Sequence, residues 1–172
     1  MDGGTDACIS GAEPDQIDGI VEQWQSERPD LDLSAMGMFA RMKMFIAGLT
    51  ASMDDELDKH GLTPGEFDVL STLRRTGPPC VLIPSQLSAS LMMSRAGITN
   101  RLDRLEAAGL VKRNLDPDDR RSFRVGLTDK GLAVIDDALT GHAANIARLA
   151  NHLTAEQREQ FDQALRVLLR AL

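Results

Sequence analysis

The densest group of basic side chains lies between residues 94 and 124. This segment holds eight lysines and arginines and five acids, a net charge of +3, whereas the whole chain carries −7. Guanidinium and ammonium groups bind phosphate, and phosphate binding needs a locally basic surface rather than a basic protein. The segment therefore predicts a surface for a polyanion such as nucleic acid. A mixed, solvated surface has the same composition and stays open as the alternative.

The start of this segment has the spacing of an amphipathic helix over 94–108. Ile98, Leu102 and Leu105 share one side of such a helix, and Ala96 and Asn100 lie almost opposite. Hydroxyl, amide, guanidinium and small apolar groups on the exposed side suit base edges in the major groove. The expected DNA-contacting residues of this helix are Ser94, Arg95, Ala96, Thr99, Asn100 and Arg104. An ordinary surface helix is the alternative.

An arginine pair marks a charged turn between two predicted strands, 110–115 and 123–127. Arg120 and Arg121 at this turn are suited to enter a minor groove or bind phosphate, with Asp118 or Asp119 bracing an arginine. A solvated loop is the alternative. A short helix over 84–91, a tight turn and the helix over 94–108 precede the hairpin. This order is typical of a winged helix-turn-helix that binds double-stranded DNA.

Further helices are predicted on both sides of this module. Apolar stripes predict a helix over 14–28 and a longer one over 34–60, whose apolar face is Phe39, Met42, Ile46, Leu49, Met53 and Leu57. Thr63, Thr128 and Thr154 stand where helix N-caps belong. The last helix is expected to bury Phe161, Leu165, Leu168 and Leu169. The chain is therefore expected to be mainly α, with a short β-hairpin.

The sequence resembles the MarR family of transcription regulators over about residues 34–172. The segments that carry the resemblance are Leu62-Thr63-Pro64, Phe67-Asp68-Val69-Leu70, Ser85-Gln86-Leu87, Thr99-Asn100-Arg101-Leu102, Gly109-Leu110-Val111-Lys112-Arg113, Asp116-Pro117-Asp118-Asp119-Arg120-Arg121-Ser122, Leu127-Thr128 and Lys130-Gly131. The resemblance implies a homodimer with interlocking terminal helices. Its two recognition helices would enter successive major grooves of a pseudo-palindromic operator, with half-sites roughly 10 bp apart.

The resemblance also implies a division of the chain. Residues 1–12 are expected to be a disordered N-terminus, and 13–172 one MarR-like domain. Within it, 14–28 would be an extra N-terminal helix, 62–127 the winged helix-turn-helix DNA-binding region, and 34–60 and 128–172 the helical dimerisation region.

Residues 17–32 are similar to the extra first helix of the urate-responsive branch of that family. Members of that branch bind a purine-type anion with a tryptophan, an aspartate and two arginines, and the matching positions are Trp24, Asp68, Arg101 and Arg113. An indole can stack on a flat heterocycle, a guanidinium can pair with its oxyanion, and a carboxylate can accept from ring N–H groups. The resemblance implies a repressor that urate or xanthine releases from DNA. Structural ion pairs of Asp68 and a Trp24 in the core are the alternative.

Other classes of function find little support in the sequence. Asp54, Asp55 and Glu56 lie on a charged helix face without a partner motif, and no nucleophile elbow or glycine-rich phosphate loop is present. The histidines lack metal-ligand spacing. We therefore expect no catalytic residue, no metal and no cofactor. No apolar run reaches the roughly 20 residues of a membrane span, so a cytoplasmic protein without a membrane partner is expected.

Two alternative signals for a regulator stay open. The chain could respond to a small anion other than a purine. Cys80, just before the winged module, could instead respond to oxidants, although a buried, inert cysteine has the same sequence signature.

Overall fold

The computed structural model describes residues 13–116 and 123–172. Residue contacts divide the chain into two compact units, Met1–Thr50 and Ala51–Leu172. The predicted disorder of residues 1–12 and the predicted hairpin tip, with Arg120 and Arg121, lie outside the described residues.

The first unit is built from two helices, α1 (Gln16–Glu27) and the first part of α2 (Ser34–Asp58). The Asp15 carboxylate accepts from the Ile17 and Asp18 amides, and the Asp18 carboxylate accepts from the Asp15 amide, which makes a capping box. Arg41 of α2 pairs with both carboxylates, at 2.7 Å from Asp15 and 2.5 Å from Asp18. The helix predicted over 14–28 is therefore present and is tied to α2.

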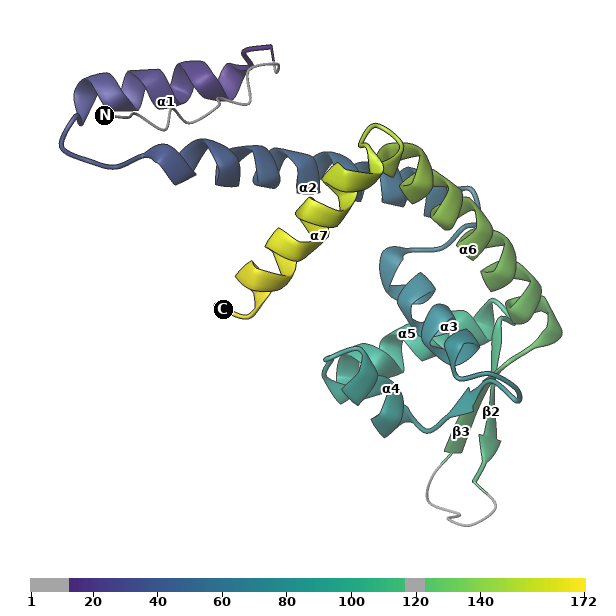
Figure 1. The fold of residues 1–172 in the computed structure, drawn as a ribbon. Coiled ribbons are helices and arrows are strands. Elements are labelled where there is room, and N and C mark those ends of the chain that lie inside the picture. Colours follow the sequence, from purple (N-terminus) through teal and green to yellow (C-terminus); the bar gives the residue numbers. More distant parts are fainter. Residues whose placement is uncertain (1–12, 117–122) are drawn as a thin grey trace. The chain divides into compact units, whose positions relative to one another are not determined.

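The second unit contains the winged module, whose helices and hairpin strands follow the order predicted from the sequence. Its elements are α3 (Pro64–Arg75), β1 (Val81–Leu82), α4 (Pro84–Ser90), α5 (Arg95–Ala107), β2 (Val111–Leu115) and β3 (Phe123–Leu127). Figure 1 shows α4, α5 and the strands of this module. The strands form an antiparallel sheet in the order β1-β3-β2.

Strand β1 was not predicted, because the sequence showed only a short apolar piece at 81–83. Val81 pairs with Gly126 and Leu82 pairs with Val125 of β3. A Cβ at Gly126 would come within 2.8 Å of the Val81 side chain, so the glycine makes room for the strand. Two residues are too few for an alternating pattern, and their partner strand lies more than 40 positions away.

One apolar core joins the winged module to α6 (Asp129–Ala150). Leucines on one side of α3 and α5 pack with residues of α4, β3 and α6, and the fully buried members are Val69, Leu70, Leu73, Leu87, Ile98, Leu102, Leu105, Val125 and Ile135. A Cβ at Gly131 would overlap the Leu110 carbonyl, so this glycine lets α6 approach the end of α5. The inward face predicted for α5 is confirmed.

The terminal helix α7 (Ala155–Leu169) corrects one expectation. Thr154 caps it as predicted. However, Phe161 is 44% and Leu169 70% exposed, and no residue of α7 is buried. The prediction that its apolar stripe is buried is wrong for the single chain, because an apolar stripe does not say which element covers it. The apolar face predicted for α2 is also mostly uncovered, since Leu57 is the one residue of that face that is buried.

No helix among the described residues is both long enough and apolar enough to span a membrane.

Candidate nucleic-acid interface

The N-terminal end of α5 presents a set of small and polar side chains to solvent. Ser94 caps the helix, because its Oγ accepts from the Gly97 amide at 3.2 Å. Ile98, Leu102 and Leu105 are buried in the core and fix the rotation of the helix about its axis. The predicted base-reading residues Ser94, Ala96, Thr99, Asn100 and Arg104 are exposed, and the side chain of Arg95 lies outside the described atoms. This end of α5 therefore has the shape and chemistry of a recognition helix.

Ionic contacts hold α5 to the start of α3. The Arg101 guanidinium donates to the Gly65 carbonyl at 3.3 Å, and Arg104 lies 3.2 Å from Glu66. A Cβ at Gly65 would overlap the Arg101 guanidinium, so the lack of a side chain at this position makes room for the guanidinium. Glu66 also accepts from the Thr63 amide in the predicted capping box. Arg101 is half-buried.

A second ionic cluster holds α5 to strand β2. Arg113 Nη2 lies 2.6 Å from Asp103 Oδ1, and the Arg113 amide donates to Glu106 at 3.2 Å. The guanidinium also lies 5.3 Å from the centre of the Phe123 ring, a cation–π contact. Its Nε is 3.5 Å from Glu106 and, among the described residues, has no hydrogen-bond partner. Arg113 therefore links the recognition helix to the wing and keeps one unused donor.

The four residues of the predicted ligand site fall into two groups. Trp24 belongs to the first unit and is 49% exposed, so the alternative that it is core is not met in the single chain. Asp68, Arg101 and Arg113 belong to the second unit. Asp68 is exposed, and within the described residues it pairs with neither arginine. The alternative of structural ion pairs between Asp68 and these arginines is therefore not met, and the arginines contact Gly65, Asp103 and Glu106 instead.

The base of the wing is held by a contact that sequence reasoning missed. Asp116 is buried and accepts two hydrogen bonds from Arg124, at 2.8 and 3.1 Å. Such a bidentate pair is strong and directional. The bracing contact predicted for Asp118 or Asp119 concerns the arginines of the hairpin tip and lies outside the described residues. Strand pairing of Asn114 with Arg124 decides the contact, because it brings Arg124 close to the end of β2.

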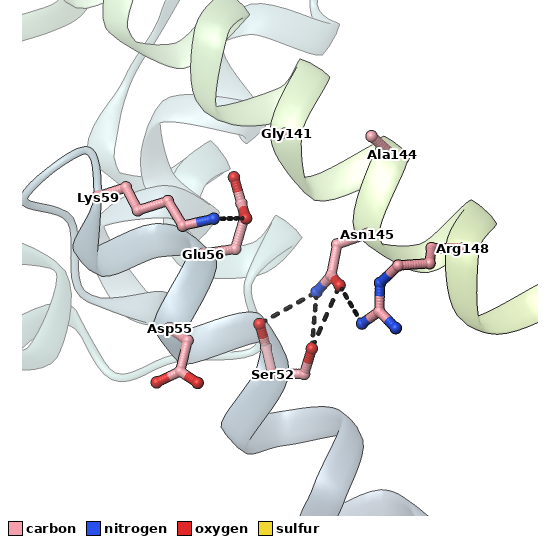
Figure 2. Close-up of a pocket in the computed structure, with 8 residues that line it drawn as sticks. All are labelled: Ser52, Asp55, Glu56, Lys59, Gly141, Ala144, Asn145 and Arg148. Atoms are coloured by element: carbon pink, nitrogen blue, oxygen red, sulfur yellow. Dashed lines mark hydrogen bonds and ion pairs between the residues drawn. The ribbon is translucent and has the colours of Figure 1, made fainter.

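The second unit also contains a polar pocket of about 460 Å³ that the sequence did not indicate (Figure 2). The last turns of α2 and the second half of α6 line it with Ser52, Asp55, Glu56, Lys59, Gly141, Ala144, Asn145 and Arg148. Asn145 bonds Ser52 at 3.0 Å, Arg148 bonds Asn145, and Lys59 pairs with Glu56. These polar groups satisfy one another. The hydrogen bonds between Asn145 and Ser52 join α6 to α2. No three potential metal ligands cluster among the described residues.

Comparison with known proteins supports the resemblance to the MarR family. The family model for the MarR family matches residues 60–122. PecS of Dickeya dadantii, an HTH-type transcriptional regulator, is 36% identical over 83% of this chain and 86% of its own length. The chain belongs to the MarR family. A second regulator, MhqR of Bacillus subtilis, is 30% identical over 73% of this chain and 88% of its own length.

Solved structures of similar fold agree with this family. The YusO protein of Bacillus subtilis has a TM-score of 0.67 and 26% identity over 82% of this chain and 98% of its own. AbsC of Streptomyces coelicolor, a MarR family transcriptional regulator, has a TM-score of 0.72 and 24% identity over 82% and 95%. The predicted mainly helical winged helix-turn-helix fold is confirmed. The protein is a DNA-binding transcription regulator of the MarR family and not an enzyme.

Proposed function

We propose that the protein is a dimeric repressor that a purine-type anion, such as urate or xanthine, releases from a pseudo-palindromic operator. Two relatives, MdtR and YetL of Bacillus subtilis, are named transcriptional repressors. Two proteins of similar fold, MepR of S. aureus and Sco3205 of Streptomyces coelicolor, have been solved with DNA, at TM-scores of 0.68 and 0.71. These proteins support the repressor and operator parts of the proposal.

The observation that carries the ligand part is the ionic cluster around Arg113. Two carboxylates of the recognition helix, Asp103 and Glu106, contact the Arg113 guanidinium, which otherwise packs on Phe123. An anion that binds this guanidinium competes directly with both carboxylates. Binding of the anion therefore weakens a tie between α5 and β2. Because α5 is the recognition helix, weakening this tie acts directly on the element that contacts DNA.

The other three residues have roles that follow from the family resemblance and from their chemistry. The Arg101 guanidinium donates a 3.3 Å hydrogen bond to a carbonyl and forms no ion pair among the described residues, so its charge is available for an anion. Asp68 is exposed and suits the ring N–H groups of a purine. Trp24 offers an exposed indole for stacking. The ligand shifts the population away from the DNA-binding state only by its difference in affinity for the two states.

The dimer part of the proposal rests on exposed apolar helices. Phe39, Phe45 and Ile46 of α2, and Phe161 and Leu169 of α7, are all more than two-fifths exposed. Large apolar side chains that gather on an exposed surface mark protein interfaces. A two-fold dimer through these helices presents two recognition helices to one palindromic site.

The experiment is a gel shift with the intergenic DNA beside the gene, repeated with urate, xanthine, a nucleotide and a polycarboxylate. We expect a shifted band that urate or xanthine abolishes. Calorimetry on the pure protein must then show binding of the same purine, and its absence would remove the purine from the proposal. Arg101→Ala should keep much of the DNA affinity and lose the release by ligand. Unchanged release in this variant would exclude the coupling role of Arg101.

A response to oxidants at Cys80 has less support. The Cys80 side chain is only 8% exposed, and oxidation favours accessible thiolates. Cys80→Ser should therefore bind DNA as tightly as the wild type and be released by the purine to the same extent. Loss of a peroxide response in this variant would reverse the assignment.

A further inference from the structure

Two residues other than glycine adopt a left-handed backbone among the described residues, Cys80 with φ 57° and Met92 with φ 50°. Elsewhere the chain uses glycine for this conformation, at Gly61, Gly77 and Gly109. A side chain at such a position strains the backbone, which glycine avoids. The two residues that keep a side chain there are therefore worth comparing.

The two residues differ in what their side chains do in the free protein. Cys80 is buried and packs within the second unit, so its side chain contributes to folding. Met92 is 95% exposed, so its side chain contributes almost nothing to the packing of the chain. Both the strain and the exposure would disappear with glycine at position 92. The apolar side chain of Met92 is therefore available for contact with another molecule.

The turn between α4 and α5 holds Met92 outward. Ser88 Oγ donates to the Met93 carbonyl at 2.5 Å, and the Met93 amide donates to the Ser88 carbonyl at 3.1 Å. Met93 packs against the apolar core, which leaves its neighbour on the outer side. Ser94, the next residue, caps the recognition helix. Met92 thus stands two residues before the exposed end of α5 that faces DNA in a helix-turn-helix protein.

We propose that Met92 is a specificity residue that contacts the C5-methyl group of a thymine in each operator half-site. The thymine methyl is the apolar group that a base pair presents in the major groove, and apolar side chains recognise it by contact. A flexible thioether side chain adapts well to such a surface. The inference rests on the proposed binding of a palindromic operator and adds a base preference to it.

The first test is selection of duplexes from a random pool by the wild-type protein and by Met92→Gly. Wild-type protein should enrich a thymine at one position of each half-site, and the variant should accept other bases there. Replacing that thymine by uracil, which lacks the methyl, should weaken wild-type binding about fourfold per half-site. The same replacement should leave the affinity of the variant unchanged.

Folding and charge effects are separated by two further measurements. Met92→Gly should melt at the same or a higher temperature, because glycine relieves the left-handed strain. Its affinity for random-sequence DNA and the dependence of that affinity on salt should match the wild type, because no phosphate contact is removed.

Three results would overturn the inference, and they are distinguishable. If wild type and variant enrich the same thymine and respond equally to uracil, Met92 does not read the methyl. If the wild type enriches no palindromic sequence at all, the operator proposal itself is wrong. An equal loss of affinity for every duplex in the variant would also contradict a role in specificity.

Discussion

The winged module and the terminal helices both carry rows of large apolar side chains, but the module buries them and the terminal helix α7 leaves them exposed. Leu102 and Leu105 of α5 are buried, whereas Phe161 and Leu169 of α7 are largely exposed. Both helices are amphipathic and both are capped by a hydroxyl side chain. The difference indicates that the winged module completes its core within one chain, with the help of α6. The terminal helix α7, by contrast, leaves an apolar face uncovered in the single chain, as the proposed dimer requires.

The largest expected effect lies in the winged module. Leu102→Ala removes a fully buried side chain that packs among α3, α4 and α5. We expect the free energy of unfolding to fall by about 2–5 kcal/mol, as for other core leucines. Urea denaturation followed by circular dichroism measures it. A loss below about 1 kcal/mol would mean that this core is not the stable part of the molecule.

The second prediction concerns the exposed face of α7. Phe161→Arg should raise the dissociation constant of the dimer about thirtyfold or more, as loss of a central aromatic anchor does. Sedimentation velocity at several concentrations measures it. Gln163→Ala is the matched control, because Gln163 lies on the same helix and bonds only Glu159 among the described residues. Equal dissociation constants in both variants would place the interface elsewhere.

The third prediction sharpens the role of the ionic cluster at Arg113. Asp103→Asn removes the charge that competes with an anionic ligand for the guanidinium. Exposed ion pairs are worth little, so purine affinity should rise only about two- to fivefold. Calorimetry compares this variant with Asp162→Asn, which breaks the pair with Arg166 on α7. Weaker purine binding in Asp103→Asn would contradict the competition.

The smallest effect is expected at the Asp15–Arg41 contact of the first unit. The hydrogen bond from Arg41 lowers the pKa of Asp15 from 3.8 to about 2. Because the folded pKa is depressed, the contact contributes fully above pH 3.8 and is lost as the pH falls toward 2. In Arg41→Met the pKa of Asp15 should return toward 3.8. NMR titration of the carboxyl group measures it, and an unchanged pKa would show that Arg41 is not its cause.

Several elements could be predicted because their signals are local. Thr63, Ser94, Thr128 and Thr154 each cap the helix that follows them. A cap bonds amides two or three residues away, so its pattern is legible in the sequence. The rotation of α5 about its axis was also predictable, because three buried positions at helical spacing define it.

The partners of the charged residues were not predictable. Arg113 contacts Asp103 and Glu106 rather than Asp68, and Arg124 contacts Asp116. Every one of these acids has the same charge and a similar reach. The choice among them depends on which helix and strand pack together.

The sequence by itself determined the family, the order of the elements and the residues at the start of the recognition helix. Only the tertiary structure decided which carboxylates hold Arg113, that α7 leaves its apolar face uncovered, and that Met92 stands outward in a strained turn. The physical reason is the range of the interactions. Capping and helical periodicity act between neighbours in the chain, whereas ion pairs and burial depend on segments that meet only after folding.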